Sequence, residues 1–278
     1  MSEAERRATR QAQSEAYTHG HHESVLRAHR WRTAENSAGY LLGDLHPGQR
    51  LLDVGCGPGT ITLDLAARVA PGHVLGIDAS ADVIRQAEAT RAEAGVANVE
   101  FATGDVYHLG QDDGTYDVAH AHQVLQHLAD PVAGLKEMRR VLRPGGILAV
   151  RDADYGAFVW GPPDARLDRW RELYHQVTAR NGAEADAGRH LLTWVRQAGF
   201  DDVRTTSSTW TFADPDSRAW WGGLWSERVV ASSYADQAVA YGLSDEDELA
   251  GLAEAWRQWA ARDDGLFIVL HGEVLARI

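Results

Sequence analysis

The sequence has very little of the chemistry that marks several classes of protein. Cys56 is the only cysteine among 278 residues, so no disulfide can form within the chain, and Lys136 is the only lysine. No apolar run approaches the roughly 18–20 residues that a membrane span needs. The charged segment 1–13 lacks the apolar centre of a secretory signal. We therefore expect a cytoplasmic protein with no membrane insertion.

The charge of the chain excludes a further class of partner. The formal net charge is −13, and Lys and Arg form no cluster along the sequence. A polyanion binds where basic side chains displace its counterions, so nucleic acid is a poor candidate. We expect a small-molecule partner instead, and the sequence leaves a homodimer open.

The first half of the chain alternates between two patterns. Short apolar runs at 50–54, 73–77, 99–102, 116–121 and 147–150 predict strands, and the segments between them include two clear helices, at 81–94 and 131–138. Ile61, Leu65 and Val69 form one apolar face on a further helix, after the first strand. Five strands with short helical connections predict an α/β fold with a parallel, doubly wound sheet.

The pattern changes after Tyr155. Helices are predicted at 164–179, 186–198, 217–241 and 244–261, with strands at 203–212 and 266–278, and residues 1–35 are predicted to be helical. We divide the chain into an N-terminal helical lid (1–45), a core (46–155) and a helical insertion with the last two strands (156–278). Trp210, Trp220, Trp221 and Trp225 either pack this insertion onto the sheet or form an aromatic box for a flat substrate.

The most informative stretch is Leu51-Leu52-Asp53-Val54-Gly55-Cys56-Gly57-Pro58-Gly59-Thr60. An apolar strand ends there, three alternate glycines follow, and a helix begins. Glycines suit a turn where a ligand approaches the backbone more closely than a Cβ allows. The small side chain of Cys56 fits the same turn. The pattern predicts a nucleotide-type binding loop.

Acids follow the first three strands, at Asp53, Asp78 and Asp105. Ligands of doubly wound sheets bind outside the carboxyl ends of the strands, so these acids are expected to face one crevice. Asp78 is placed to accept both hydroxyls of a ribose, and Asp105 to accept from an adenine amine. Asp53 suits the amino group of a methionine moiety, or it caps amides of its own loop.

Two phosphate-binding patterns fail here. The dinucleotide fingerprint needs a glycine where Thr60 stands, and no Gly-Lys-Ser/Thr of a P-loop is present. A binding loop without a phosphate clamp suits S-adenosylmethionine (SAM), which carries no phosphate.

Five motifs in order carry a family resemblance, over roughly residues 45–155. They are the glycine loop, Gly76-Ile77-Asp78-Ala79-Ser80, Gly104-Asp105 with Tyr116-Asp117-Val118, His122-Gln123-Val124-Leu125-Gln126-His127 and Leu142-Arg143-Pro144-Gly145-Gly146. The chain resembles the class I SAM-dependent methyltransferases, and among them the small-molecule enzymes related to ubiquinone and menaquinone C-methyltransferases. The resemblance implies a Rossmann-like sheet of about seven strands with the last one antiparallel.

The resemblance also implies which residues contact the cofactor SAM. The ribose side involves Asp78 and Ala79, the adenine side Gly104, Asp105 and Val106, and the methionine side His122 and Gln123. The N-terminal segment that includes Tyr17 and His22 is implied to fold over the cofactor. With the loop residues, the implied set is Tyr17, His22, Asp53, Gly55, Gly57, Gly59, Asp78, Ala79, Gly104, Asp105, Val106, His122 and Gln123.

Few side chains are candidates for proton transfer during methylation. His122 is the first candidate and His127 the second, because the ordinary pKa of histidine is near neutrality. Asp152 and Asp154 follow the fifth strand, and we expect one of them, Asp152, to reach the pocket. Each of these residues has an alternative role in packing or on a solvated loop. We expect no metal, since His19, His21 and His22 lack the company that metal sites need.

These inferences favour a SAM-dependent methyltransferase acting on a small, aromatic or polyketide-like metabolite. Carbon, oxygen and nitrogen acceptors all remain open. The alternatives are a SAM-binding protein with a regulatory role and no turnover, and an NAD-dependent dehydrogenase.

Overall fold

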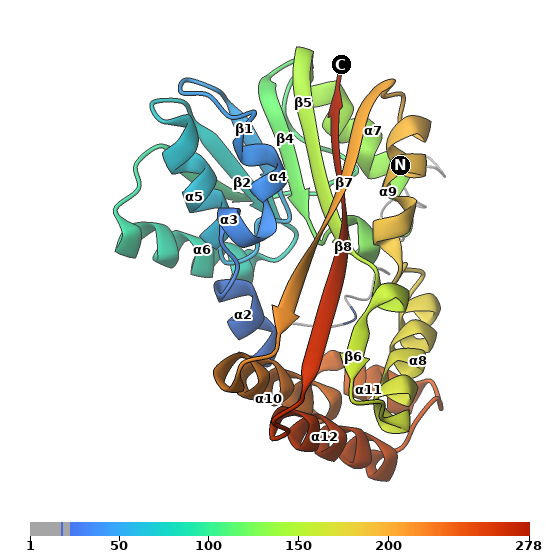
Figure 1. Ribbon diagram of the computed structural model, residues 1–278. Coiled ribbons are helices and arrows are strands. Elements are labelled where there is room, and N and C mark those ends of the chain that lie inside the picture. The colour runs from blue at the N-terminus through green and yellow to red at the C-terminus, as the bar shows by residue number, and fades with distance from the viewer. Residues whose placement is uncertain (1–17, 19–22) are drawn as a thin grey trace.

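One eight-stranded sheet runs through the molecule (Figure 1). The computed structural model describes Thr18 and residues 23–278. The sheet order is β3-β2-β1-β4-β5-β8-β6. β5 and β6 pair with successive parts of one edge of β8, and β7 pairs with the opposite edge. The strands are β1 (Leu51–Val54), β2 (Val74–Asp78), β3 (Val99–Thr103), β4 (Tyr116–His122), β5 (Leu142–Ala153), β6 (Val159–Gly161), β7 (Asp202–Phe212) and β8 (Leu266–Arg277).

The first five strands are parallel and the later ones reverse direction. β1 pairs in parallel with β2 and β4, β2 with β3, and β4 with β5. β8 is antiparallel to β5, β6 and β7. Parallel strands need crossover connections, and helices supply most of them here. The α/β fold with a doubly wound sheet and an antiparallel last strand is confirmed, with eight strands where about seven were expected.

Alternate residues of each strand supply two separate cores. Leu51 packs with α5 (Thr60–Val69) and with the short helices α3 (Ala34–Ser37) and α4 (Gly39–Leu42). Its neighbour Leu52 points to the opposite face, where α7 (Pro131–Val141) and α9 (Ala187–Gln197) lie. This strand is covered on both faces, so residues 51–54 are all buried, and three of the four are apolar.

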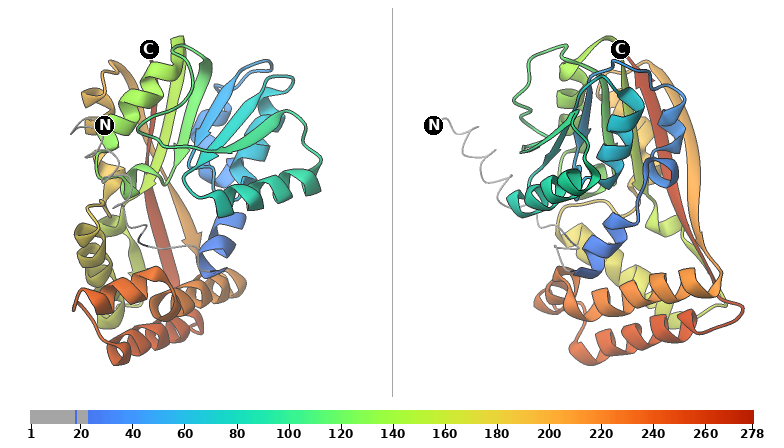
Figure 2. Two further views of the ribbon diagram at one scale, coloured as in Figure 1. Left: turned by 180° about the vertical axis from the view of Figure 1, so that it is seen from behind. Right: turned by 90° about the vertical axis from the view of Figure 1, so that its left-hand side faces the viewer.

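A third core lies beyond the sheet. It joins α8 (Ala165–Arg180), α10 (Pro215–Ala231), α11 (Ser233–Ala240) and α12 (Glu246–Ala260). Trp170, Trp225 and Trp256 are fully buried at its centre, with edge-to-face and stacked ring contacts. The arrows of β4 and β5 point toward this helical layer, and the long strands β7 and β8 reach down to it (Figure 1). Figure 2 shows the layer of α10 and α12 from two further sides.

The N-terminal part bridges the sheet and the helical layer. The helix α2 (Glu23–Arg30) lies against α10, and Arg27 forms an ion pair with Glu227 there. Trp31, just after α2, contacts the rings of Trp210 and Trp220. The expected helix over 1–35 is therefore described only from residue 23 onward, and it ends at Arg30.

Two other expectations need correction. The helix expected over 217–241 is two helices, because Ser232 has extended backbone angles (φ −111°, ψ 169°) between α10 and α11. The short strand β6 was not expected, since its three residues carry no periodic pattern and its existence depends on pairing with β8. No helix in the described part of the chain is long and apolar enough to cross a membrane.

A close backbone approach fixes α9 on β8. A Cβ on Gly272 would lie 2.1 Å from the carbonyl oxygen of Gly188, and a Cβ on Gly188 would lie 2.9 Å from the amide nitrogen of Gly272. Only hydrogen fits at either position, so the helix and the strand meet through backbone atoms. This contact holds the segment after β5 against the sheet.

We predict that Gly272→Ala lowers the free energy of unfolding by about 1–3 kcal/mol, because the clash is with backbone that cannot rotate away. Gly251→Ala is the matched control. Gly251 is exposed inside α12 with no neighbouring atom in reach of a Cβ, so alanine there should stabilise by about 0.5–1 kcal/mol. Urea unfolding of both variants measures the two signs, and equal effects would contradict the packing described here.

Candidate functional site

A cavity of about 670 Å³ lies where the parallel strands end, and three parts of the chain line it. Its volume is in the range of about 300–1,000 Å³ that small-molecule sites occupy. The loops after β1 to β4 line one side. Segment 28–32 and the insertion line the other, and the main side chains there are Trp31, Arg32, Tyr155, Phe158, Trp210, Trp220, Trp221 and Arg228.

The glycine loop has the backbone shape that its sequence predicts. Gly55 and Gly57 have positive φ values of 68° and 56°, and both line the cavity. A Cβ on Gly55 would lie 2.3 Å from Cγ2 of Val124, so only glycine lets the loop pass this side chain. The amide of Cys56 donates to the carbonyl of Ile77 (2.9 Å), which ties the loop to β2.

Gly59 has a different role from the other two glycines. It is the left-handed residue before α5 and is not among the residues that line the cavity. A Cβ there would meet the ring of Phe101 at 2.7 Å. Gly59 therefore allows α5 to begin close to β3, and the structure does not bring it to the ligand side of the loop.

Asp78 ends β2 and lines the cavity with Ala79. Its carboxylate accepts hydrogen bonds from the amide of Gly57 (3.2 Å) and from the amide of Ser80 (3.0 Å). The side chain of Ser80 caps α6 (Ala81–Ala94) by accepting from the amide of Val83. These bonds fix the half-buried carboxylate between the glycine loop and the start of α6, at the mouth of the crevice.

Asp53 lies deeper and already has two protein partners. It is 2% exposed, and its carboxylate accepts from Oγ1 of Thr62 (2.5 Å) and contacts Nδ1 of His120 (2.7 Å). Asp53 and His120 are neighbours in the register of β1 and β4. The residue touches the cavity wall, but its charge is used inside the protein to join β1, β4 and α5.

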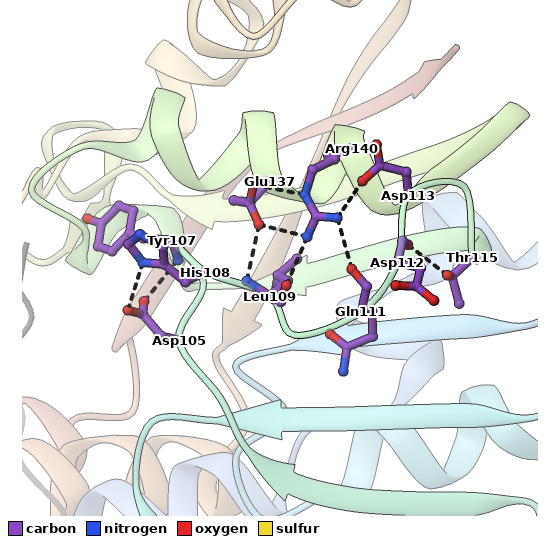
Figure 3. A network of polar contacts seen from close by, with 10 residues as sticks. All are labelled: Asp105, Tyr107, His108, Leu109, Gln111, Asp112, Asp113, Thr115, Glu137 and Arg140. Carbon is purple, nitrogen blue, oxygen red and sulfur yellow. Dashed lines mark hydrogen bonds and ion pairs between the residues drawn. The ribbon is translucent and has the colours of Figure 1, made fainter. Parts of the chain in front are cut away.

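Asp105 closes a turn in the loop after β3 (Figure 3). Its carboxylate accepts from the amide of Tyr107 (2.9 Å) and contacts Nδ1 of His108 (3.4 Å). The residue also lines the cavity with Gly104 and Val106. The turn role and the ligand role that the sequence leaves open are compatible with this position.

Arg140 on α7 anchors the connection between β3 and β4. Arg140 donates to the carbonyls of Leu109 (2.8 Å) and Gln111 (2.9 Å), and it pairs with Asp113 and Glu137 (Figure 3). The charged pairs raise the pKa of Arg140, so the cation is present at any working pH. The anchor holds the long β3–β4 connection, and thereby the turn at its start.

A row of polar residues crosses four strands next to the cavity. His122 on β4 is in register with Arg151 on β5, Arg151 with Glu273 on β8, and Glu273 with Thr206 on β7. Nε of Arg151 lies 3.3 Å from Oε1 of Glu273, and the guanidinium also donates to the hydroxyl of Ser208. We call this the polar row.

Burial shapes the charges in the polar row. Desolvation lowers the pKa of Arg151 to about 10, although Glu273 opposes the shift, so Arg151 stays a cation at neutral pH. Desolvation and the nearby Arg151 hold the pKa of His122 well below its usual value. His122 is therefore a neutral imidazole that lines the cavity beside a buried cation.

Gln123 has a strained backbone at the end of β4. Its φ of 55° is the one positive value that a non-glycine residue shows in the described ranges. Oε1 accepts from Nη2 of Arg32 (2.6 Å), and Nε2 lies 2.9 Å from Nε2 of His271. Such strain persists where the surroundings fix it, and here two side-chain bonds hold the residue at the cavity wall.

The other two candidate catalytic residues are placed differently. His127 lines the cavity, and desolvation with Arg32 lowers its pKa to about 3, so it is neutral. Asp152 is not among the lining residues. Its Oδ1 accepts from the amide of Gln126 (3.1 Å), and desolvation raises its pKa to about 8. Asp154, likewise away from the cavity, pairs with Arg189. The structure brings neither acid to the site.

Tyr17 and His22, implied to cover the cofactor, lie outside the described residues. Within the described part, Trp31 and Arg32 carry the N-terminal segment to the cavity. The tryptophans divide between their two expected roles. Trp210, Trp220 and Trp221 line the cavity, whereas Trp225 is buried in the helical core.

Comparison with known proteins gives the family. The methyltransferase-domain family profile matches residues 45–199. An uncharacterized methyltransferase of Schizosaccharomyces pombe is 32% identical over 93% of this chain and 95% of its own. A probable methyltransferase of Aspergillus luteorubrus is 30% identical over 95% of this chain and 98% of its own. The chain belongs to the methyltransferase family, which confirms the resemblance that its motifs carry.

Solved structures and shorter matches add to this relation. The YcgJ protein of Bacillus subtilis superposes with a TM-score of 0.55 at 15% identity, over 86% of this chain and 96% of that one, and shows the fold alone. The [4+2]-cyclase SpnF has a TM-score of 0.50 at 25% identity, over 92% and 87%. An O-methyltransferase of Aspergillus nomiae is 34% identical over 58% of this chain and 70% of its own.

The buried Asp152 predicts a pH dependence of stability. Its pKa of about 8 in the folded chain lies above the ordinary 3.8, so the folded state keeps a proton that the unfolded state releases between these values. The contribution of Asp152 to the free energy of unfolding should therefore fall as pH rises from 5 to 8, by up to about 1.4 kcal/mol per pH unit, whereas the buried neutral histidines His122 and His127 act in the opposite direction below their ordinary pKa.

Asp152→Asn removes this proton and keeps the oxygen that Gln126 needs, so the free energy of unfolding of the variant relative to wild type should rise with pH. Urea unfolding at pH 5, 6, 7 and 8 measures both slopes. Asp263→Asn, at an exposed acid, is the control and should keep the wild-type slope. Equal slopes for wild type and Asp152→Asn would contradict a proton held at this site.

Proposed function

We propose that the protein transfers a methyl group from SAM to a small aromatic metabolite, without a metal. The observation that carries the proposal is one cavity with two unlike sides. One side has the glycine loop and the carboxylates of Asp78 and Asp105. The other side has aromatic rings with arginine and histidine side chains. A cofactor and a flat acceptor would meet between them.

The residues present fit SAM on the first side. Gly55 and Gly57 leave the backbone bare at the cavity wall, and Asp78 is fixed at the end of β2 by two amides. We assign the ribose hydroxyls to Asp78 with Ala79, and the adenine to Gly104, Asp105 and Val106. Gln123 and His122 would lie beside the methionine part. Asp53 would act on its amino group only indirectly, because Thr62 and His120 already occupy its carboxylate.

SAM, when bound, supplies an electrophilic methyl group on a sulfonium, so the protein needs no covalent nucleophile. The contribution of this chain is then to hold the acceptor in line and to exclude water. Trp31 and Trp220 pack at 5.1 Å between ring centroids, on the N-terminal segment and α10. Both rings line the cavity.

The aromatic lining favours an aromatic acceptor. Six aromatic side chains line the cavity from the N-terminal segment, the end of the core and the insertion, namely Trp31, Tyr155, Phe158, Trp210, Trp220 and Trp221. Such rings bind flat, electron-rich guests by stacking and edge contacts. The relative from Aspergillus nomiae bears the name O-methyltransferase, which supports oxygen as one acceptor atom.

A second candidate is a SAM-type fold that catalyses another reaction or only binds. The specific observation in its favour is the [4+2]-cyclase that superposes on most of this chain. The NAD-dependent dehydrogenase is disfavoured by the family relation and by Thr60 in the place of the third glycine. A turnover assay separates methyl transfer from this second candidate.

The assay incubates the protein with methyl-tritiated SAM and a panel of phenols, naphthols, indoles and hydroxyquinolines. We expect label to transfer to one class of hydroxylated arene, with NMR of the product identifying the methylated atom. Saturable SAM binding with no transfer to any member would favour the second candidate.

We predict that Asp78→Ala weakens the affinity for S-adenosylhomocysteine (SAH) by about tenfold or more. The loss follows from hydrogen bonds to a charged acceptor, worth about 1.5–3 kcal/mol. Calorimetry measures the affinity, and Glu93→Ala, at an exposed acid of the neighbouring α6, should leave it unchanged. Equal SAH affinities of Asp78→Ala and wild type would contradict the assignment of Asp78 to the cofactor site.

A further inference from the structure

His122 lines the cavity and has one buried ring nitrogen without a protein partner in the described part of the chain. The residue ends β4 and is 5% exposed. The nitrogen in question is Nε2. A buried ring nitrogen without a protein partner requires an explanation, and a ligand in the cavity supplies one.

The neighbour of Nδ1 fixes where the proton of this imidazole sits. Nη1 of Arg151 lies 3.5 Å from Nδ1, and a guanidinium can only donate. Nδ1 must therefore carry the lone pair. Burial and the cation keep the ring neutral, so its single proton is on Nε2. A neutral imidazole in this tautomer can donate from Nε2 and cannot take up a proton there.

Arg151 cannot turn away to release the other tautomer. Glu273 and Ser208 hold its guanidinium from β8 and β7, and the ring of Trp210 lies 4.9 Å from its central carbon. The other charged or titratable groups that lower the pKa of His122 are Arg32, His271 and His120, and the acid Glu273 lies one strand further along the polar row, bonded to Arg151. Burial and the neighbouring cations together favour the neutral ring.

The charges of the cavity point to the same kind of guest. Arg32 and Arg228 line the side formed by the N-terminal segment and the insertion. The described acids that line the cavity, Asp53, Asp78 and Asp105, all belong to the loops after β1, β2 and β3. Arginine has five donors, so each can bond a guest while it keeps its protein contacts. The acceptor side thus favours negative charge.

We propose that His122 donates a hydrogen bond from Nε2 to an oxygen of the methyl acceptor, and that the acceptor binds as an oxyanion, a phenolate or an enolate. This inference rests on the proposed function and narrows its substrate class, because it excludes amines. The acceptor loses its proton to solvent water on binding. An electron pair of the oxyanion, on oxygen or a conjugated carbon, then forms the bond to the methyl carbon while the carbon–sulfur bond breaks and its electrons remain on sulfur.

Two substitutions separate a donor from a proton acceptor at this position. In His122→Gln the amide nitrogen can occupy the place of Nε2, so a donor is kept although the side chain cannot titrate. In His122→Asn the shorter amide lies near Nδ1 and leaves the cavity without this donor. Thermal unfolding and SAH calorimetry of both variants check that the fold and the cofactor site are intact.

The probe is 4-nitrophenol, whose anion absorbs visible light, bound to the protein saturated with SAH. A hydrogen bond to the anion lowers the pKa of a bound phenol, whereas burial alone raises it. We expect the pKa of bound 4-nitrophenol to lie about one unit or more below its solution value in wild type and His122→Gln, and to rise in His122→Asn. 4-Nitroanisole, which cannot ionise, should bind more weakly than 4-nitrophenol to wild type.

Three results would overturn the inference while SAH still binds. They are a raised or unchanged pKa of 4-nitrophenol on the wild-type protein, an equal loss in the Gln and Asn variants, and no saturable binding of 4-nitrophenol. The equal loss would mean that His122 acts as a base. Failure of the wild-type protein to bind SAH would instead reject the proposed function itself, so the two failures are distinct.

Discussion

The shared edge at which the parallel strands end determines where the glycine loop and the residues proposed to bind the cofactor lie. β1, β2, β4 and β5 run in one direction, so the glycine loop, Asp78 and His122 meet although they are far apart in sequence. The tight turn at Gly55 exists only because no side chain stands between the loop and Val124. The helical insertion and the segment after α2 then close the space above this edge. Cofactor loop and aromatic wall are thus two sides of one cavity.

The polar row is the least expected part of the structure. Burying a guanidinium costs several kcal/mol unless its bonds are well made, and Arg151 is fully buried with Glu273, Ser208 and the ring of Trp210 around it. An apolar pair at these positions would stabilise the sheet as well or better. The row instead sets the charge and tautomer of His122 at the cavity, so its value is chemical. We interpret this buried ion pair as part of the site, since it contacts a residue that we propose to bind the guest.

Local pattern predicted the strands, most helices, the glycine loop and the edge where the site lies, because each depends on residues close in sequence. Long-range pairing could not be predicted. Arg151 meets Glu273 only because β8 inserts beside β5, and the carboxylate of Asp53 contacts Thr62 and His120 only in the folded sheet. Asp152 was expected in the pocket, but the alternation of β5 turns it to the amide of Gln126. The break at Ser232 carries no glycine or proline that would mark it. The roles of the tryptophans could not be predicted either. Trp221 lines the cavity, whereas Trp225, one helical turn later, is buried in the helical core.

The central claim is that the crevice at the strand edge binds SAM and places its methyl group next to the aromatic wall. Equilibrium dialysis of the folded protein against radiolabelled SAM tests it most directly. The account predicts saturable retention of one SAM per chain, displaced by SAH and unaffected by NAD. Absence of retention by correctly folded protein, or displacement by NAD, would contradict it.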